Sequence, residues 1–215
     1  MEGSIGVKKA LRGTGLALLA LLAAGPSMAA EKSAFVPAVI YAIGQKFDKS
    51  FNEAAFDGAQ RFERESGVKV LETEPANVTQ FEQAVSSLVR RGATDIAAVG
   101  FYYATPLNDV APKFPGVRFT LVDSRVDQPN VQSIVFKEHE GSFLVGMMAG
   151  MVSKTGRIGF VGALDIPLLR KFSTAYGEGA RHVNPNAEVL LSFISATPAG
   201  FNDPTKGAEV ARSQF

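Results

Sequence analysis

The chain lacks cysteine and has only two histidines among its 215 residues. Without cysteine it can form no disulfide, no thiolate metal site and no thiol nucleophile, and it offers no cysteine to a lipid. His139 and His182 have no partner at a ligand-like spacing, so we expect no metal. A phosphate-binding G-x-x-x-x-G-K-[ST] loop and a G-x-S-x-G nucleophile turn are also absent from the sequence. We therefore expect a protein that is not an enzyme and needs no cofactor.

An excess of basic residues is also lacking. The chain has 22 basic and 21 acidic residues, and residues 1–30 hold three of the basic and one of the acidic ones, which leaves a net charge of −1 on the remainder. Nucleic-acid binding requires a positively charged surface. We therefore expect no nucleic-acid partner.

The first thirty residues have the pattern of a secretory signal peptide. Three basic residues precede the apolar run 16–24, and small residues follow at Ser27 and Ala29. The run is too short for a transmembrane helix, which needs about 20 apolar residues. We expect residues 1–30 to be a signal peptide, and the product to be periplasmic and not lipidated.

Strand and helix patterns alternate along the next hundred residues. Ser50-x-x-Glu53 and Thr79-x-x-Glu82 are capping boxes that open helical patterns ending at Gly67 and Gly92, and a short helical stretch follows near 107–111. Apolar runs predict strands over 35–42, 68–71, 96–100, 117–123 and 131–136. This alternation predicts a mostly parallel sheet with right-handed crossovers.

The same alternation restarts near Glu138. It predicts a helix over 143–152, a strand over 157–162, a helix from Pro167 to about His182, a strand over 189–194, and a helix opened by Asp203-Pro204. We therefore predict an α/β protein with two lobes, each a mostly parallel sheet flanked by helices. The lobes are residues 31–136 and 137–215, and the second is partial.

Polar and aromatic residues follow the predicted strands at the edge where open α/β sheets bind ligands. Carboxylates and amides orient a polar ligand, while aromatic faces stack on a planar or sugar ring. This combination suits a nucleoside or a sugar. The candidate ligand-binding residues are Asp48, Phe51, Asn52, Tyr102, Asp123 and Phe201.

Most of these residues have a simpler structural explanation. Phe51 lies on the apolar face of its helix and is favoured by pattern as a core residue. Asp48 can be a carboxylate that complements the helix dipole, and Asp123 can begin a turn. Tyr102 can be a surface aromatic. Asp203, close to Phe201, is best explained as a helix N-cap.

Four segments together resemble the basic membrane protein family, the solute-binding components of ABC importers that include purine nucleoside receptors. The segments are FDKSFN at 47–52, FKEHEGSFLVG at 136–146, GFVG at 159–162 and NDPTKG at 202–207. The resemblance implies a type I periplasmic binding fold, truncated in the second lobe. It also implies that the lobes close on a ligand and present it to a membrane permease.

The resemblance also assigns roles to individual residues. Phe51 matches the stacking aromatic of the first lobe, and Asn52 matches its neighbouring polar contact. Asp123 matches the carboxylate that holds a ribose hydroxyl. Phe201 matches an aromatic position that would supply the opposing face from the second lobe.

Two residues depart from the family pattern. An acidic residue usually stands nine positions before the stacking aromatic, where this chain has Ala42, and a glycine is common where it has Gln45. Loss of that carboxylate removes a contact of about 1.5–3 kcal/mol, which is enough to change ligand preference. We expect a purine nucleoside as the ligand, with a sugar or another small polar solute as the alternative. A ligand-sensing surface protein of the same fold is a further alternative.

Overall fold

The computed structural model describes residues 35–215, so the predicted signal peptide lies outside the described residues. The described residues form one compact unit. In this described part, no helix combines the length and the apolar character that a membrane crossing requires.

The first sheet has five parallel strands in the order β2-β1-β3-β4-β5. The strands are β1 (Pro37–Ile40), β2 (Leu71–Thr73), β3 (Asp95–Val99), β4 (Arg118–Val122) and β5 (Val131–Ile134). The helices are α1 (Phe51–Ser66), α2 (Phe81–Arg90) and α3 (Ala104–Val110), with 3-10 turns η1 (Val78–Gln80), η2 (Phe101–Tyr103) and η3 (Ala111–Lys113). The predicted parallel α/β arrangement is therefore confirmed.

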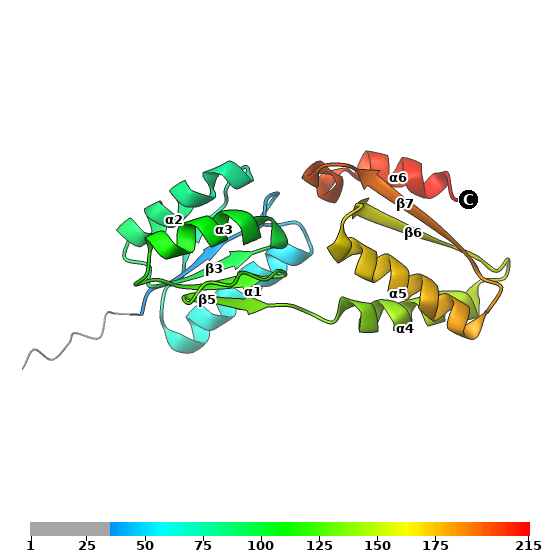
Figure 1. The fold of residues 1–215 in the computed structure, drawn as a ribbon, viewed down its shortest axis with the longest axis horizontal. Coiled ribbons are helices and arrows are strands. Elements are labelled where there is room, and N and C mark those ends of the chain that lie inside the picture. Colours follow the sequence, from blue (N-terminus) through cyan, green and yellow to red (C-terminus); the bar gives the residue numbers. More distant parts are fainter. Residues whose placement is uncertain (1–34) are drawn as a thin grey trace, which may run out of the picture. The chain divides into compact units, whose positions relative to one another are not determined.

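Helices cover both faces of this sheet. α2 and α3 lie on one face and α1 lies on the other (Figure 1). The core forms under α2 and α3, where Phe81 and Leu88 pack against Ile40 and Phe119, all of them fully or almost fully buried. This burial fixes the sheet, and with it the edge at which the strands end.

Two local predictions are corrected. The second strand begins at Leu71 rather than at 68, because side chains bind the preceding backbone: Ser66 Oγ accepts from Val68 N, and a Glu63 carboxylate oxygen accepts from Val70 N. The box predicted at Thr79 is also wrong. Asn77 caps that segment instead, and its side chain accepts from the backbone N–H of Thr79 at 3.1 Å.

The second sheet contains two parallel strands, β6 (Arg157–Leu164) and β7 (Glu188–Ser195). α4 (Glu138–Val152) and α5 (Pro167–Val183) lie on one face, and α6 (Pro204–Arg212) lies on the other, after the turn η4 (Pro198–Asn202) (Figure 1). α4 begins five residues before the predicted start at 143, since the acidic residues of its first turn favour the positive end of the helix dipole.

α4 and α5 approach closely through glycines. A Cβ on Gly146 would collide with the backbone carbonyl of Tyr176, and one on Gly150 would lie 2.7 Å from the carbonyl oxygen of Ala180. Both glycines are buried, whereas Gly141 on the same helix has no neighbour within 4 Å of a Cβ. Glycine is therefore required at Gly146 by close backbone packing.

We predict that Gly146→Ala destabilises the protein by about 1–3 kcal/mol, because the colliding atom belongs to a helix backbone that cannot rotate away. The matched variant Gly141→Ala should stabilise it by about 0.5–1 kcal/mol, since alanine is the better helix former at an open position. Urea unfolding followed by circular dichroism measures both. Equal effects of the two substitutions would show that the helix contact is not specific.

Candidate functional site

A cavity of about 270 Å³ lies at the carboxyl ends of β1, β3 and β4. Loops leave the sheet there because parallel strands end at a common edge, which is the usual ligand site of open α/β sheets. The six residues nominated by the sequence all line it: Asp48, Phe51, Asn52, Tyr102, Asp123 and Phe201. The structure therefore brings all of the predicted residues to one place.

Asp48 caps the first turn of α1. One carboxylate oxygen accepts from the N–H groups of Ser50 at 2.8 Å and Glu53 at 3.2 Å, and the other accepts from Asn52 N at 3.0 Å. Glu53 accepts in turn from Lys49 N at 2.8 Å, and the Ser50 hydroxyl makes no capping bond. The box predicted at Ser50 is therefore wrong, because Asp48 takes the position of the cap.

Asn52 ties the end of β1 to the start of α1. Its side-chain oxygen accepts from Ala42 N at 2.8 Å, and its side-chain nitrogen donates to Ala42 O at 3.0 Å and Gln45 O at 3.2 Å. Only 2% of the residue is exposed. Both amide hydrogens are engaged by the chain, so the amide shapes the wall of the cavity and leaves no donor for a ligand.

Besides Phe51 and Phe172, three aromatic rings line the cavity and form a cluster. Phe101 and Tyr102 lie with their centroids 4.0 Å apart, and Phe201 meets them at 6.3 and 6.1 Å, almost perpendicular to Tyr102. Phe51 is 39% exposed and faces the cavity, which argues against the core role that its pattern favoured. The site therefore offers several aromatic faces to a ring.

The two neighbouring tyrosines have different roles. Tyr103 is a core residue whose hydroxyl donates to Tyr41 O at 2.7 Å and whose ring stacks on Phe81. Tyr102 lines the cavity, and its buried hydroxyl has no hydrogen-bond partner among the described residues. Burial raises the pKa of both hydroxyls, so they stay neutral. Tyr102 is therefore not the surface aromatic that was the alternative for this residue.

Asp123 occupies a strained position at the end of β4. Its φ of 78° lies in the left-handed region, which non-glycine residues seldom adopt, and such strain concentrates at functional sites. Its backbone N–H donates to Ile134 O at 2.8 Å, which holds the residue beside β5. The carboxylate is thus presented to the cavity rather than used in a turn.

The charge of Asp123 is poorly compensated. Burial and the nearby Glu138 charge raise the pKa of the Asp123 carboxyl, and Lys171 partly offsets them. Lys171 Nζ lies 3.6 Å from a Glu138 carboxylate oxygen, so the two acidic groups share one cation. Among the described residues, no group of three or more His, Asp or Glu side chains is arranged to hold a metal ion.

Part of the wall was not predicted from the sequence. Leu168, Leu169 and Phe172, in the first turns of α5, line the cavity together with the first-sheet residues. The available signal was Pro167, which marks a helix start directly after β6. Ligands of open α/β sheets bind beyond the carboxyl ends of the strands, so a helix that starts directly after a strand places its first residues where a ligand binds.

We predict that Asp48→Ala destabilises the protein by about 1–2 kcal/mol, because three N–H groups at the start of α1 lose their acceptor. Ser50→Ala, the matched control, should change stability by less than about 0.5 kcal/mol, since the hydroxyl caps nothing. Chemical denaturation of both variants is the measurement. A larger loss of stability from Ser50→Ala than from Asp48→Ala would show that Ser50 is the cap.

We predict that Asp123→Asn raises the melting temperature at pH 7 by about 2 °C, because the unfavourable buried charge is removed. The raised pKa means that the folded state holds its proton more tightly than the unfolded chain. Wild-type stability should therefore fall as pH rises from the unfolded value of about 3.9 through the folded pKa.

The difference between the two proteins should accordingly vanish below about pH 4 and reach its full size above the folded pKa. Melting curves recorded from pH 3.5 to 8 test this. A difference that is independent of pH would assign the gain to backbone conformation alone.

Comparisons with known proteins identify the family of this chain. The family profile described as Bmp, "ABC transporter substrate-binding protein PnrA-like", matches residues 35–215. The chain is 33% identical over 180 residues to an uncharacterised lipoprotein of Pyrococcus horikoshii, covering 81% of this chain and 44% of the relative. It is 27% identical over 173 residues to the ABC transporter nucleoside-binding protein BmpA of Lactococcus lactis subsp. cremoris, covering 78% and 48%.

The fold is also similar to a solved structure. The crystal structure of an ABC transporter solute-binding protein from Aeropyrum pernix matches with a TM-score of 0.74 and 30% identity, covering 83% of this chain and 51% of that chain. The chain thus spans about half the length of the relatives it matches. With its parallel sheets and flanking helices, it has a type I periplasmic-binding-protein-like fold and belongs to the Bmp family of extracytoplasmic ABC transporter substrate-binding proteins.

Proposed function

We propose that the cavity captures a neutral nucleoside between the two predicted lobes and that the protein delivers it to a membrane permease. The observation that carries the proposal is the Asp123 carboxylate, which faces a cavity with aromatic walls. Burial and neighbouring charges, rather than a hydrogen bond from the protein, set its pKa. Its oxygens are therefore free to accept from the hydroxyls of a sugar ring.

Aromatic side chains in the cavity wall provide the proposed binding surface for the base. Phe51 and the cluster of Phe101, Tyr102 and Phe201 surround a space in which a planar base can stack. Stacking on aromatic side chains contributes about 1–3 kcal/mol per base. A carboxylate for the sugar and aromatic rings for the base together favour a nucleoside over a free sugar.

The charges of the lining favour a neutral ligand. Asp48 and Asp123 are the carboxylates of the cavity wall, and among the described residues neither lysine nor arginine lines it. A phosphate group would approach two carboxylates without a compensating cation, which is unfavourable in a partly desolvated site. The proposed ligand is therefore a nucleoside and not a nucleotide.

Ala42 limits the selectivity for the base. Its side chain lies in the cavity wall, at the position where the family pattern has a carboxylate. A methyl group cannot accept a hydrogen bond from a base, so recognition of the base rests mainly on stacking, which every base permits. We propose purine nucleosides as the preferred ligands, because their larger rings stack over a greater area.

The proposed place of action is the periplasm. The signal-peptide pattern of residues 1–30 favours export, and the relative from Pyrococcus horikoshii is named a lipoprotein. This chain contains no cysteine to carry a lipid. We therefore propose an exported, non-lipidated binding protein that meets the membrane through its permease.

A thermal-shift titration tests the proposal, with protein lacking residues 1–30 and with adenosine, guanosine, uridine, adenosine monophosphate, ribose and galactose. We expect purine nucleosides to raise the melting temperature in proportion to the logarithm of their concentration, and the nucleotide to have little effect. Stabilisation by the sugars alone would favour the sugar-binding alternative. No response from a cooperatively melting protein would contradict both ligands.

Two substitutions test whether Phe51 and Asp123 contact the nucleoside. Phe51→Ala should weaken nucleoside binding by about 1–3 kcal/mol through lost stacking, and Asp123→Asn should weaken it by about 1.5–3 kcal/mol through a lost charged acceptor. Phe47→Ala is the matched control, because Phe47 is exposed, packs on Phe56 and does not line the cavity. If the folded Phe51→Ala variant binds the nucleoside with unchanged affinity, Phe51 has a packing role and does not contact the ligand.

A further inference from the structure

The ammonium group of Lys46 is well enclosed. In the other ion pairs of the described residues, the lysine and arginine side chains are 50% to 85% exposed, whereas the Lys46 side chain is 19% exposed. Removing an ammonium from water is costly, so it requires compensating contacts. Lys46 lies in the loop between β1 and α1, and this loop lines the cavity through Ala42, Ile43, Asp48 and Ser50.

Two carboxylates of the first sheet bind Lys46. Its Nζ donates to Glu72 Oε2 at 2.9 Å and lies 3.8 Å from Glu74 Oε1. Its backbone N–H donates to the other carboxylate oxygen of Glu74 at 3.3 Å. Glu72 belongs to β2, and Glu74 follows the end of that strand. Both carboxylates therefore connect the loop to the edge of the sheet.

Aromatic rings enclose the other sides of the ammonium. The ring centroids of Phe56, Phe47 and Tyr41 lie 4.8, 5.3 and 5.5 Å from Nζ, within the range of about 6 Å for cation–π attraction. Tyr41 is buried and its backbone N–H donates to Thr73 O at 3.1 Å, while Phe56 belongs to α1, so both rings are anchored. Phe47 is exposed and belongs to the same loop as Lys46, so it covers the ammonium without tying the loop to the sheet.

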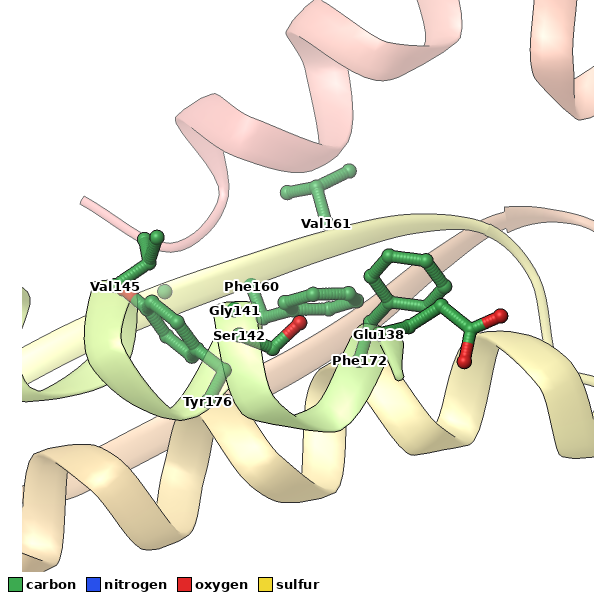
Figure 2. Close-up of a pocket in the computed structure, with 9 residues that line it drawn as sticks. Glu138, Gly141, Ser142, Val145, Phe160, Val161, Phe172 and Tyr176 are labelled. Atoms are coloured by element: carbon green, nitrogen blue, oxygen red, sulfur yellow. The ribbon is translucent and has the colours of Figure 1, made fainter. Parts of the chain in front are cut away.

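A looser ion pair beside the second sheet provides a contrast. The Glu138 side chain is 6% exposed and lies at one end of a groove of about 500 Å³ between α4, α5 and β6 (Figure 2). Lys171 Nζ is 3.6 Å from Glu138 Oε2, and this buried oxygen has no hydrogen-bond partner among the described residues. The Lys46–Glu72 pair has the length of a charge-assisted hydrogen bond, which fixes the direction of the lysine side chain.

We propose that Lys46 is a positioning residue of the ligand cavity, because its ammonium fixes the loop that forms one wall. The inference rests on the proposed function. Lys46 does not line the cavity, so it acts through its neighbours. Gln45 O accepts from the side-chain nitrogen of Asn52 at 3.2 Å, and the same amide binds Ala42 in the cavity wall. A loop that is fixed before binding spares the ligand the cost of ordering it.

Lys46→Met tests the role of the charge. Methionine keeps an unbranched apolar chain that suits aromatic surroundings, but it leaves Glu72 and Glu74 without their cation. We expect adenosine binding, measured by isothermal titration calorimetry, to be at least about tenfold weaker, because the charged tie and the cation–π contacts are lost. Hydrogen exchange of the amides of residues 42 and 46 should be at least about tenfold faster, while exchange in β3 and β4 should not change.

Two further variants separate charge from packing. Lys46→Arg keeps a cation among the rings and carboxylates, and should bind adenosine within about threefold of wild type. Lys69→Met is the matched control, because Lys69 Nζ lies 2.9 Å from Glu63 Oε2 on a side chain that is 85% exposed and does not line the cavity. It should change adenosine affinity by less than about twofold, as expected of an exposed ion pair.

Two results would overturn the inference. One is a Lys46→Met protein that binds adenosine as wild type does. The other is faster exchange across the whole first sheet without a local change at residues 42 and 46, since that indicates only a general contribution to stability. If wild-type protein binds no nucleoside, the proposed function is contradicted, and the exchange comparison, which uses no ligand, still decides whether Lys46 fixes the loop.

Discussion

The loop between β1 and α1 is held in place by the side-chain amide of Asn52. That amide bonds the backbone of Ala42 at the end of the strand and of Gln45 within the loop. Because the Asn52 side chain is buried, losing these bonds would leave part-buried backbone groups without a partner, and a fully buried group left unpaired costs about 1–3 kcal/mol. The direction of Phe51 and the position of the Asp48 cap both depend on this tie, so the cavity wall depends on it too.

The cavity is built from features that oppose stability. Asp123 has a strained backbone and an incompletely compensated charge, and the buried hydroxyl of Tyr102 has no partner in the described part of the chain. Such groups are uncommon in ordinary cores, where nearly every buried polar group is satisfied. They are tolerated because the sheet below them is well packed, and they leave polar atoms at the cavity that other described residues do not use.

The two sheets differ in how completely they are covered. Apolar residues of the first sheet are sealed under α2 and α3, whereas α4 beside the second sheet exposes a row of methionine, leucine and valine side chains. The close glycine contacts between α4 and α5 hold that row in a fixed orientation.

The sequence by itself determined the order of strands and helices, the parallel α/β class, and the strand ends at which the six site residues lie, because apolar periodicity and capping residues act locally. It also determined the N-cap at Asp203, whose side chain accepts from Lys206 N at 2.8 Å. Only the tertiary structure decided which candidate polar groups remain free. Asp48 and Asn52 are engaged by their own loop, and Asp123 is exposed to the cavity. The tertiary structure also decided that Leu168 and Phe172 line the cavity. Their position there results from packing between segments that are distant in the sequence, and no local sequence pattern encodes such packing.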